Sequence, residues 1–265
     1  MDNFPSLSVF HFPFSIMNNL YDESWLYDLI HEKSPDSKEI NFYEKQIRKY
    51  GSPVLELACG SGNYAVTLSQ SDVEISGIDI SDEMLHAAER RAEQQHTETN
   101  LINADMRNFE LNQQFALIFV AGNSLQHLNR REDVEACFDS VRRHLKPDGK
   151  FIVEVFNPSL KLLNRNPNER FFVGEYRTEN GFVVLTENVR YDIASQINFI
   201  DWHYKNQYHK EEQTVSFTMR QFFPQELDSL FQYNGFQIEA KYGDFDESAF
   251  TSNSPKQIII ASSAK

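Results

Sequence analysis

The sequence predicts a doubly wound α/β fold, in which a seven-stranded, mostly parallel sheet carries helices on both faces and an inserted antiparallel sheet. Short apolar runs alternate with amphipathic helical stretches through the first 157 residues, as is typical of parallel sheets. The first of these runs ends in a glycine turn that leads into a helix. After residue 170, aromatic residues alternate with polar ones, which is typical of antiparallel strands.

The glycine turn, Cys59 to Gly62, follows the apolar run Val54 to Ala58. Small residues let the backbone approach a ligand closely. We expect a helix from Asn63 to Ser69, whose N-terminal N–H groups would face that ligand. The second strand, Glu74 to Ile80, holds Asp79 nineteen residues after the first glycine. An acid at this distance, at the end of a strand, is placed to accept hydrogen bonds from ribose hydroxyls, so the stretch predicts a nucleotide-like cofactor.

Hydrophobic periodicity and turn residues predict the other elements in order. Ser81 should cap the helix that follows the second strand. The most apolar run, Phe115 to Val120, should be a central strand. Lys146 to Gly149 predicts a turn. The remaining expected elements are a helix from Ser15 that ends before Pro35, helices over 37–49 and 130–145, strands over 99–104 and 151–156, about four antiparallel strands within 171–223, a helix from Pro224 to Gly235, and strands over 236–242 and 257–261.

These elements divide the chain into four segments. Long connections and changes of pattern give the boundaries. The segments are an N-terminal helical lid (1–37), a cofactor-binding core (38–157), an antiparallel insertion that caps the substrate or forms a dimer contact (158–223), and the remainder of the core (224–265).

Composition excludes several classes of partner. The 25 basic and 39 acidic residues give a net charge of −14, which would repel a nucleic-acid backbone. The apolar runs are shorter than the roughly twenty residues that a membrane helix needs, and the N-terminus lacks the basic flank of a signal peptide. The two cysteines lack the spacing of metal ligands. We therefore expect a cytoplasmic protein with no metal, no nucleic acid and no membrane partner.

One carboxylate distinguishes the glycine turn from a dinucleotide site. Glu56 lies four residues before Gly60 and is not part of the dinucleotide fingerprint. With it, the stretch resembles motif I of the class I S-adenosylmethionine-dependent methyltransferases, although Ala58 stands where many members have glycine. The run LKPDGKF before the fifth strand is similar to the same family. The resemblance covers about residues 50–157 and 224–263 and implies a Rossmann-like fold that binds S-adenosyl-L-methionine.

The resemblance also implies roles for individual residues. Asp79 would bind ribose, Asp105 would accept from the adenine amino group, and the next backbone N–H would donate to the ring. The family places a tyrosine of the N-terminal region at the methionine end, and both Tyr21 and Tyr27 satisfy its loose Tyr-Asp pattern. The expected cofactor contacts are Tyr21, Tyr27, Glu56, Ala58, Gly60, Gly62, Asp79, Ile80, Met84, Asp105, Met106, Ala121 and Ser124.

His127 is the expected general base. It follows the fourth strand, and ligands of open α/β sheets bind beyond the carboxyl ends of the strands. The run Ser124-Leu125-Gln126-His127-Leu128 resembles one in small-molecule amine methyltransferases, including sugar N,N-dimethyltransferases. A group whose ordinary pKa is near 6.5 suits removal of a proton from a nucleophile. The alternative is a histidine that only packs or caps the following helix.

The insertion supplies weaker candidates for substrate binding: His203, Tyr204 and Arg220. Strand alternation places Trp202 and Tyr204 on one face and His203 on the other. The sequence leaves open which face meets the substrate.

The leading hypothesis is therefore an enzyme that transfers a methyl group from S-adenosylmethionine to nitrogen or oxygen of a small molecule. One alternative is an NAD(P)-dependent oxidoreductase, because Gly60-x-Gly62-x-x-Ala65 nearly satisfies the dinucleotide fingerprint. Another is a non-catalytic protein that binds partners through its aromatic sheet. An uncovered edge strand in that sheet would favour a homodimer.

Overall fold

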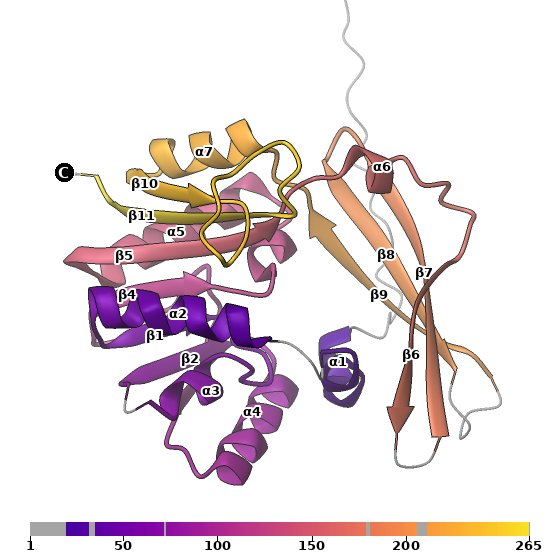
Figure 1. Ribbon diagram of the computed structural model, residues 1–265, viewed down its shortest axis with the longest axis horizontal. Helices are drawn as coiled ribbons and strands as arrows, with labels where there is room; N and C mark the ends of the chain where they lie inside the picture. Colours follow the sequence, from indigo (N-terminus) through magenta and orange to yellow (C-terminus); the bar gives the residue numbers. More distant parts are fainter. Residues whose placement is uncertain (1–19, 32–34, 72, 179–180, 206–210, 265) are drawn as a thin grey trace, which may run out of the picture.

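The computed structural model describes residues 20–31, 35–71, 73–178, 181–205 and 211–264. Within them the chain forms a core and a separate antiparallel sheet (Figure 1). The core contains α2 (Ser37–Tyr50), β1 (Val54–Leu57), α3 (Ala65–Ser69), β2 (Ile75–Asp79), α4 (Asp82–Gln95), β3 (Asn100–Asn103), β4 (Phe115–Val120), η2 (Ser124–His127), α5 (Arg131–His144), β5 (Leu145–Phe156), α7 (Pro224–Tyr233), β10 (Phe236–Tyr242) and β11 (Lys256–Ser263). The other described elements are η1 (Leu20–Asp22), α1 (Ser24–Ile30), α6 (Leu160–Leu163), β6 (Phe171–Thr178), β7 (Gly181–Asp192), β8 (Ile197–Lys205) and β9 (Gln213–Arg220).

The core sheet has seven strands in the order β10-β11-β5-β4-β1-β2-β3. Every neighbouring pair is parallel except the two that involve β11, which runs antiparallel to β5 and β10. The strand order reverses between β1 and β4, and such a switch point opens a crevice at the carboxyl ends of the strands. The predicted fold class is confirmed.

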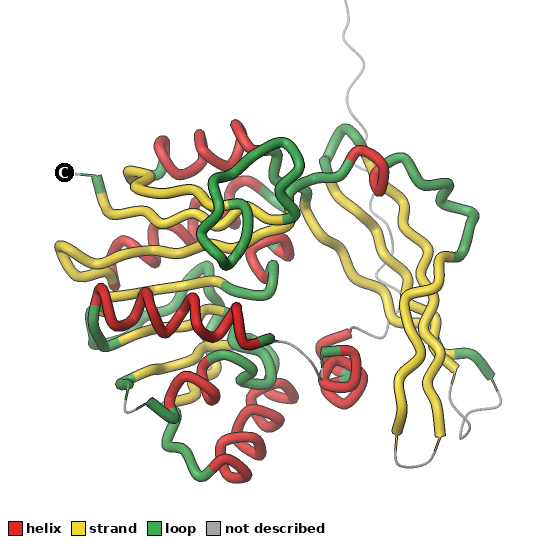
Figure 2. Tube along the Cα trace, in the orientation of Figure 1, coloured by secondary structure: helices red, strands yellow, loops and turns green. Residues whose placement is uncertain are grey.

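Helices cover both faces of this sheet (Figure 2). On one face, apolar residues of α5 and α7 pack on β4, β5 and β11, and on the other face α2, α3 and α4 pack on β1, β2 and β4. All six residues of β4 are buried, as its apolar run predicted. The α4 helix begins after the predicted cap, because the Ser81 hydroxyl accepts from the Met84 N–H. Local signals therefore position the strand ends that form the site.

Three local predictions need correction. The α3 helix begins at Ala65, two residues later than expected. The predicted helix from Ser15 is, in its described part, a short 3-10 turn followed by α1. Residues 146–149 do not form a separate turn but lie inside β5, where the pairing register with β4 shifts. Phe115 of β4 pairs with Leu145, and Leu117, two residues later, pairs with Lys150. The extra residues on β5 are accommodated as a large bulge.

The insertion is a four-stranded antiparallel sheet in the order β6-β7-β8-β9, as expected. It stands beside the carboxyl ends of the core strands, and α1 lies between the two parts (Figure 1). Leu20 and Leu26 pack against Val183, Leu185 and Tyr204 of this sheet. The N-terminal elements are thus held to the insertion by a small apolar cluster of their own.

Some predictions fall outside the described residues: the aromatic N-terminus and Ile16, the break at Ser34, and most of the turn Glu179-Asn180-Gly181. The four segment boundaries stay a prediction. No helix in the described part of the chain is both long and apolar enough to cross a membrane.

Candidate active site

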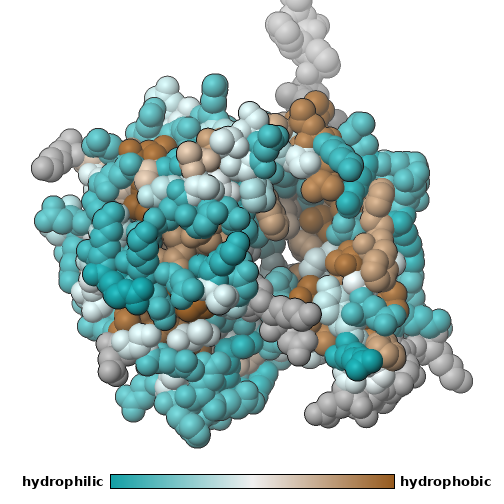
Figure 3. Space-filling model, in the orientation of Figure 1, coloured by the Kyte–Doolittle hydropathy of each residue, from teal (hydrophilic) through white to brown (hydrophobic). Residues whose placement is uncertain are grey.

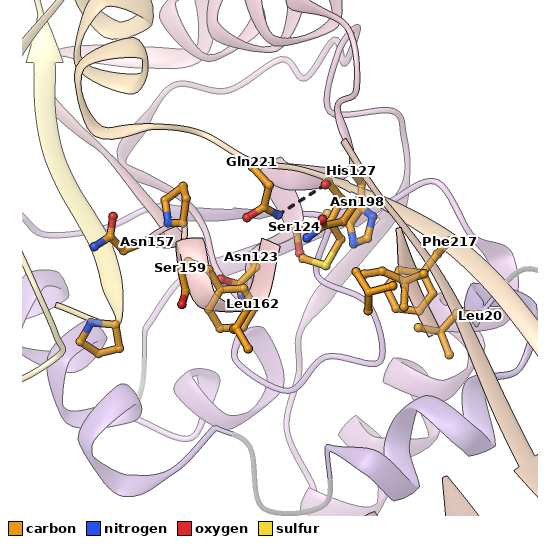
Figure 4. A pocket seen from close by; sticks show the side chains of 18 of the residues that line it. Leu20, Asn123, Ser124, His127, Asn157, Ser159, Leu162, Asn198, Phe217 and Gln221 are labelled. Carbon is orange, nitrogen blue, oxygen red and sulfur yellow. Dashed lines mark hydrogen bonds between the residues drawn. The ribbon is translucent and has the colours of Figure 1, made fainter. Parts of the chain in front are cut away.

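A cavity of about 1890 Å³ lies between the carboxyl ends of the core strands and the insertion. The molecule is hollowed between these two parts, and hydrophobic side chains gather over α6 beside the hollow (Figure 3). They include Leu160 and Leu162, which are 73% and 49% exposed. Side chains from both parts meet in the cavity, with Asn123, Ser124 and His127 from the core and Asn198 and Phe217 from the insertion (Figure 4).

The glycine turn forms one wall of the cavity. Gly60 and Gly62 have φ values of +54° and +78°, in the left-handed region that glycine adopts without steric cost. Ala58 has φ of +53° in spite of its Cβ, which costs roughly 1 kcal/mol relative to glycine. The sequence could not reveal this strain. Ala58 and Gly60 line the cavity, whereas Gly62 lies behind them against α3 and α4.

Replacing Gly62 by alanine is expected to destabilise the protein. A Cβ there would lie 2.6 Å from Val66 Cγ2 and 3.0 Å from Ala88 Cβ. Overpacking and a left-handed alanine together cost roughly 2 to 4 kcal/mol, which would lower the melting temperature by roughly 5 to 15 °C. Gly51→Ala is the matched control, because Gly51 has φ of +88° but no atom within 4 Å of the added Cβ. Equal losses in the two variants, measured by calorimetry, would contradict the steric argument.

Glu56 lies on the side of the glycine turn that faces away from the cavity. Its carboxylate accepts from the Ala65 N–H at 2.8 Å, and burial raises the pKa of the group well above its usual range. It does not line the cavity, so its contribution is to the shape of the turn. The Ala65 N–H, at the first residue of α3, is therefore not free to donate to a ligand. A buried carboxylate at a helix N-terminus leaves no place there for a diphosphate, which favours a cofactor without one.

Asp79 lies at the end of β2 and lines the cavity. One carboxylate oxygen accepts from the Gly60 N–H at 2.8 Å, and the other accepts from the Ser81 N–H at 2.9 Å. Burial raises the pKa of Asp79, and these N–H donors oppose that shift. Each oxygen keeps a further lone pair, so the fixed carboxylate can accept from two ribose hydroxyls.

The residues expected around adenine divide into two groups. Ile80 is 64% exposed, and both Ile80 and Met106 line the cavity beside Asp79. Met84 is fully buried in the core beneath them. Asp105 is outside the cavity lining, and Arg107 donates to both of its oxygens, at 2.9 and 2.5 Å. This guanidinium holds the pKa of Asp105 below its usual range, and cofactor binding through its carboxylate would have to compete with the pair.

Both tyrosines of the lid line the cavity, but at different points. A Cβ placed on Gly60 would lie 4.0 Å from the Tyr27 hydroxyl, so Tyr27 covers the glycine turn. The Tyr21 hydroxyl donates instead to His127 Nε2, and the Tyr21 carbonyl accepts from the Ser81 hydroxyl at 3.0 Å. Tyr27 therefore lies closer to the predicted cofactor site, and Tyr21 lies at the junction with the insertion.

His127 faces the cavity in a fixed tautomer. Its Nδ1–H donates to the Thr218 carbonyl on β9 at 3.0 Å, which leaves the Nε2 lone pair to accept. Burial lowers the pKa of His127 to about 4, so the ring is neutral at pH 7. Ser124, in the same η2 turn, also lines the cavity, whereas Ala121 is buried before it.

None of the three insertion candidates lines the cavity. His203 lies on the opposite face, where it contacts Thr214 and Asn188. Tyr204 packs edge-on against Trp25, and Arg220 pairs with Glu226 at 2.5 Å. The face of the insertion that meets the cavity is the one that carries Trp202. Asn198 and Glu187 lie on this face and line the cavity, and neither was among the predicted residues.

Comparisons with known proteins agree with this geometry. Residues 54–149 match the methyltransferase domain model. The dTDP-3-amino-3,6-dideoxy-alpha-D-glucopyranose N,N-dimethyltransferase of Streptomyces fradiae is 30% identical over 134 residues, about half of each chain (49% of this chain and 51% of the relative).

Two solved structures share the fold over most of the chain. The CcbJ methyltransferase of Streptomyces caelestis has a TM-score of 0.76 and 21% identity, covering 93% of this chain and 99% of that one. CalS10 of Micromonospora echinaspora, an amino pentose methyltransferase solved with S-adenosylmethionine, has a TM-score of 0.70 and 16% identity, covering 90% and 97%. These matches favour neither the oxidoreductase nor the non-catalytic alternative. With the glycine turn, Glu56 and Asp79 arranged as described, residues 54–149 match a methyltransferase domain, and the chain resembles the class I S-adenosylmethionine-dependent methyltransferases.

Proposed function

We propose that the enzyme methylates nitrogen or oxygen of a small molecule bound between the core and the insertion. The observation that carries this proposal is the glycine turn, where Glu56 occupies the first N–H of α3 and Asp79 presents a fixed carboxylate to the cavity. That arrangement fits a nucleoside without a diphosphate. The enclosing insertion and the amino-sugar substrate in the name of the Streptomyces fradiae relative support a small acceptor.

The protein contributes mainly orientation to this reaction. The cofactor supplies the methyl group, which an acceptor lone pair must approach in line with the bond that breaks. Holding the acceptor in that line contributes several kcal/mol to barrier lowering. The cavity wall around Ser124 and Phe217 lies where the acceptor would be held, beyond the carboxyl end of β4.

His127 is the proposed proton acceptor. Its Nε2 lone pair is aimed at the Tyr21 hydroxyl, and an acceptor N–H or O–H would take the place of that hydroxyl. The bond from Nδ1 to the Thr218 carbonyl fixes the tautomer that keeps Nε2 unprotonated. The tyrosine and the histidine together mark the point where we expect the nucleophile.

Two further proposals concern the compartment and the oligomeric state. Cys59 and Cys137 are both free thiols, which supports a reducing cytoplasmic compartment. The outer face of the insertion exposes Phe172, Phe182 and Phe199, which supports pairing between two copies of the chain. The absence of a nucleic-acid partner stays a prediction from net charge.

The test is calorimetric titration of the purified protein with S-adenosylhomocysteine and, in parallel, with NADH. We expect micromolar affinity for the former and no measurable heat from the latter, because the Glu56 carboxylate occupies the Ala65 N–H at the start of α3. NADH binding tighter than that of S-adenosylhomocysteine would overturn the proposal. Transfer from a labelled methyl donor to a panel of amines and phenols would then identify the acceptor.

A further inference from the structure

We infer that the acceptor is an amine without a phosphate group, and that Glu187 is the residue that selects its charge. This inference rests on the proposed function and names its substrate class. The bound ammonium group would first lose one proton, to His127 as the proposed proton acceptor. The neutral nitrogen would then give its lone pair to the methyl carbon while the bond from sulfur to that carbon breaks, so that the products are the N-methylammonium and S-adenosylhomocysteine.

Glu187 lies on the inner face of the insertion. Its partner across the β7–β8 ladder is Trp202, and directly paired residues share a face of a sheet. One oxygen of Glu187 pairs with Arg165 at 2.8 Å, and the Trp202 indole N–H donates to the other at 3.3 Å. Both Glu187 and Trp202 line the cavity. The carboxylate is therefore held by fixed partners while facing the ligand space.

An aromatic wall joins this carboxylate to the expected point of reaction. Trp202 meets Phe217 edge-on with ring centroids 4.8 Å apart, and Phe217 lies 6.4 Å from the His127 ring. All three side chains line the cavity. A carboxylate beside aromatic rings favours an ammonium group over an anion, since the ring faces also attract cations. Glu187 and His127 are therefore linked through Trp202 and Phe217 along the wall of one cavity.

The charged residues that line the cavity also favour a cationic acceptor. Among the described lining residues Arg165 is the one arginine or lysine, and Glu187 already neutralises it. His31 also lines the cavity, and burial lowers its pKa. The other acidic lining residues are Asp22, Asp79, Asp82 and Glu83. Such a wall attracts a cation and repels a phosphate.

Hydrogen-bonding capacity is an independent observation. Two described lining residues, Asn123 and Asn198, carry a buried side-chain atom without a partner, and both atoms are carboxamide oxygens. Asn123 is 8% exposed, and Figure 4 shows Asn198 beside His127 and Asn123 beside Leu162 in the same cavity. An ammonium group offers three donors and no acceptor, whereas a phosphate offers mainly acceptors. The unpartnered oxygens therefore fit an amine.

This selectivity would separate the chain from the Streptomyces fradiae relative, whose named substrate is linked to dTDP. A nucleoside diphosphate needs cations or free N–H groups around its phosphates. The described wall offers one guanidinium that is already paired. We therefore expect a free amine as acceptor.

The test uses pairs of probes that share a hydrocarbon group and differ in the charged group, on protein saturated with S-adenosylhomocysteine. The pairs are phenethylamine with phenethyl phosphate, and octylamine with octyl phosphate. We expect calorimetry to show that the amines bind at least tenfold tighter. Glu187→Gln should weaken the amines and strengthen the phosphates by roughly tenfold each, because it leaves Arg165 without its counter-charge. Asn198→Leu, of similar volume, should weaken the amines alone.

Glu212→Gln is the matched control. Glu212 pairs with Arg170 at 2.7 Å on the same insertion, outside the cavity lining, and its removal should leave the preference unchanged. Equal or tighter phosphate binding by the wild type, absence of amine binding, or an unchanged preference in Glu187→Gln would overturn the inference. Failure to bind S-adenosylhomocysteine would instead overturn the proposed function, so the two failures are distinguishable.

Discussion

Replacing Asp79 by asparagine is expected to abolish micromolar binding of S-adenosylhomocysteine. In the proposed complex the carboxylate accepts from two ribose hydroxyls while it keeps its bonds to the Gly60 and Ser81 N–H groups. Hydrogen bonds to a charged group contribute roughly 1.5 to 3 kcal/mol each. An amide offers one acceptor oxygen, and its NH2 group would face the backbone donors. Calorimetry should therefore show at least a hundredfold loss of affinity.

Glu74→Gln provides the control for this experiment. Glu74 precedes the same strand at its opposite end and accepts from Gln113 on the surface. The control should bind S-adenosylhomocysteine as the wild type does. Melting curves would show whether Asp79→Asn still folds, since the turn keeps Glu56 and its bond to Ala65. A folded Asp79→Asn protein with unchanged affinity would refute the assignment of the ribose site.

Replacing His127 by asparagine is the second change with a large expected effect. Asparagine can still donate to the Thr218 carbonyl, but it has no ring nitrogen to accept a proton. General acid–base catalysis contributes typically 10²- to 10⁴-fold, so kcat should fall by roughly that factor. Affinity for S-adenosylhomocysteine should change less than twofold. Asn129→Ala is the control, because Asn129 joins the same loop to Thr218 Oγ1 at 2.7 Å. Equal losses of kcat in the two variants would assign His127 a structural role.

The pH dependence follows from the lowered pKa of His127. Burial favours the neutral ring and lowers this pKa to about 4, so the ring is the competent proton acceptor at every pH well above that value. As pH falls through about 4 the ring gains a proton, and kcat should fall with it. Between pH 6 and pH 8 the wild-type profile should show no inflection from this histidine. An inflection near pH 6.5 that disappears in His127→Asn would contradict the burial argument.

Features set by neighbouring residues were predictable from the sequence. The β4 strand is apolar throughout, and the cap at Ser81 precedes two acids, so strand and helix bounds follow from local chemistry. The position of Asp79 against the glycine turn was predictable, because it depends on a fixed spacing from that turn. Such signals identify the core and the side of the cavity that the glycine turn forms.

Features set by contacts between distant residues were not predictable. The position of the Glu187 carboxylate depends on the register between β7 and β8 and on its ion pair with Arg165, which lies in a loop. The Asp105 carboxylate, to which the family resemblance gave a role at adenine, pairs with Arg107 and lies outside the cavity lining. Asn123 was within reach, since the loop after the fourth strand was already expected to meet the substrate. Its unpartnered oxygen became visible only in three dimensions.

The backbone of β9 supports the loop that carries the proposed proton acceptor. The Thr218 carbonyl accepts from His127, and the Arg220 carbonyl accepts from the Gln126 amide at 2.7 Å. Exchanging the insertion for that of another enzyme, in order to accept new substrates, would therefore also change the orientation of the His127 ring. Chimeras that keep residues 217–221 from this chain and exchange only β6 to β8 preserve the anchor. Directed evolution of acceptor range in this scaffold should begin from such grafts.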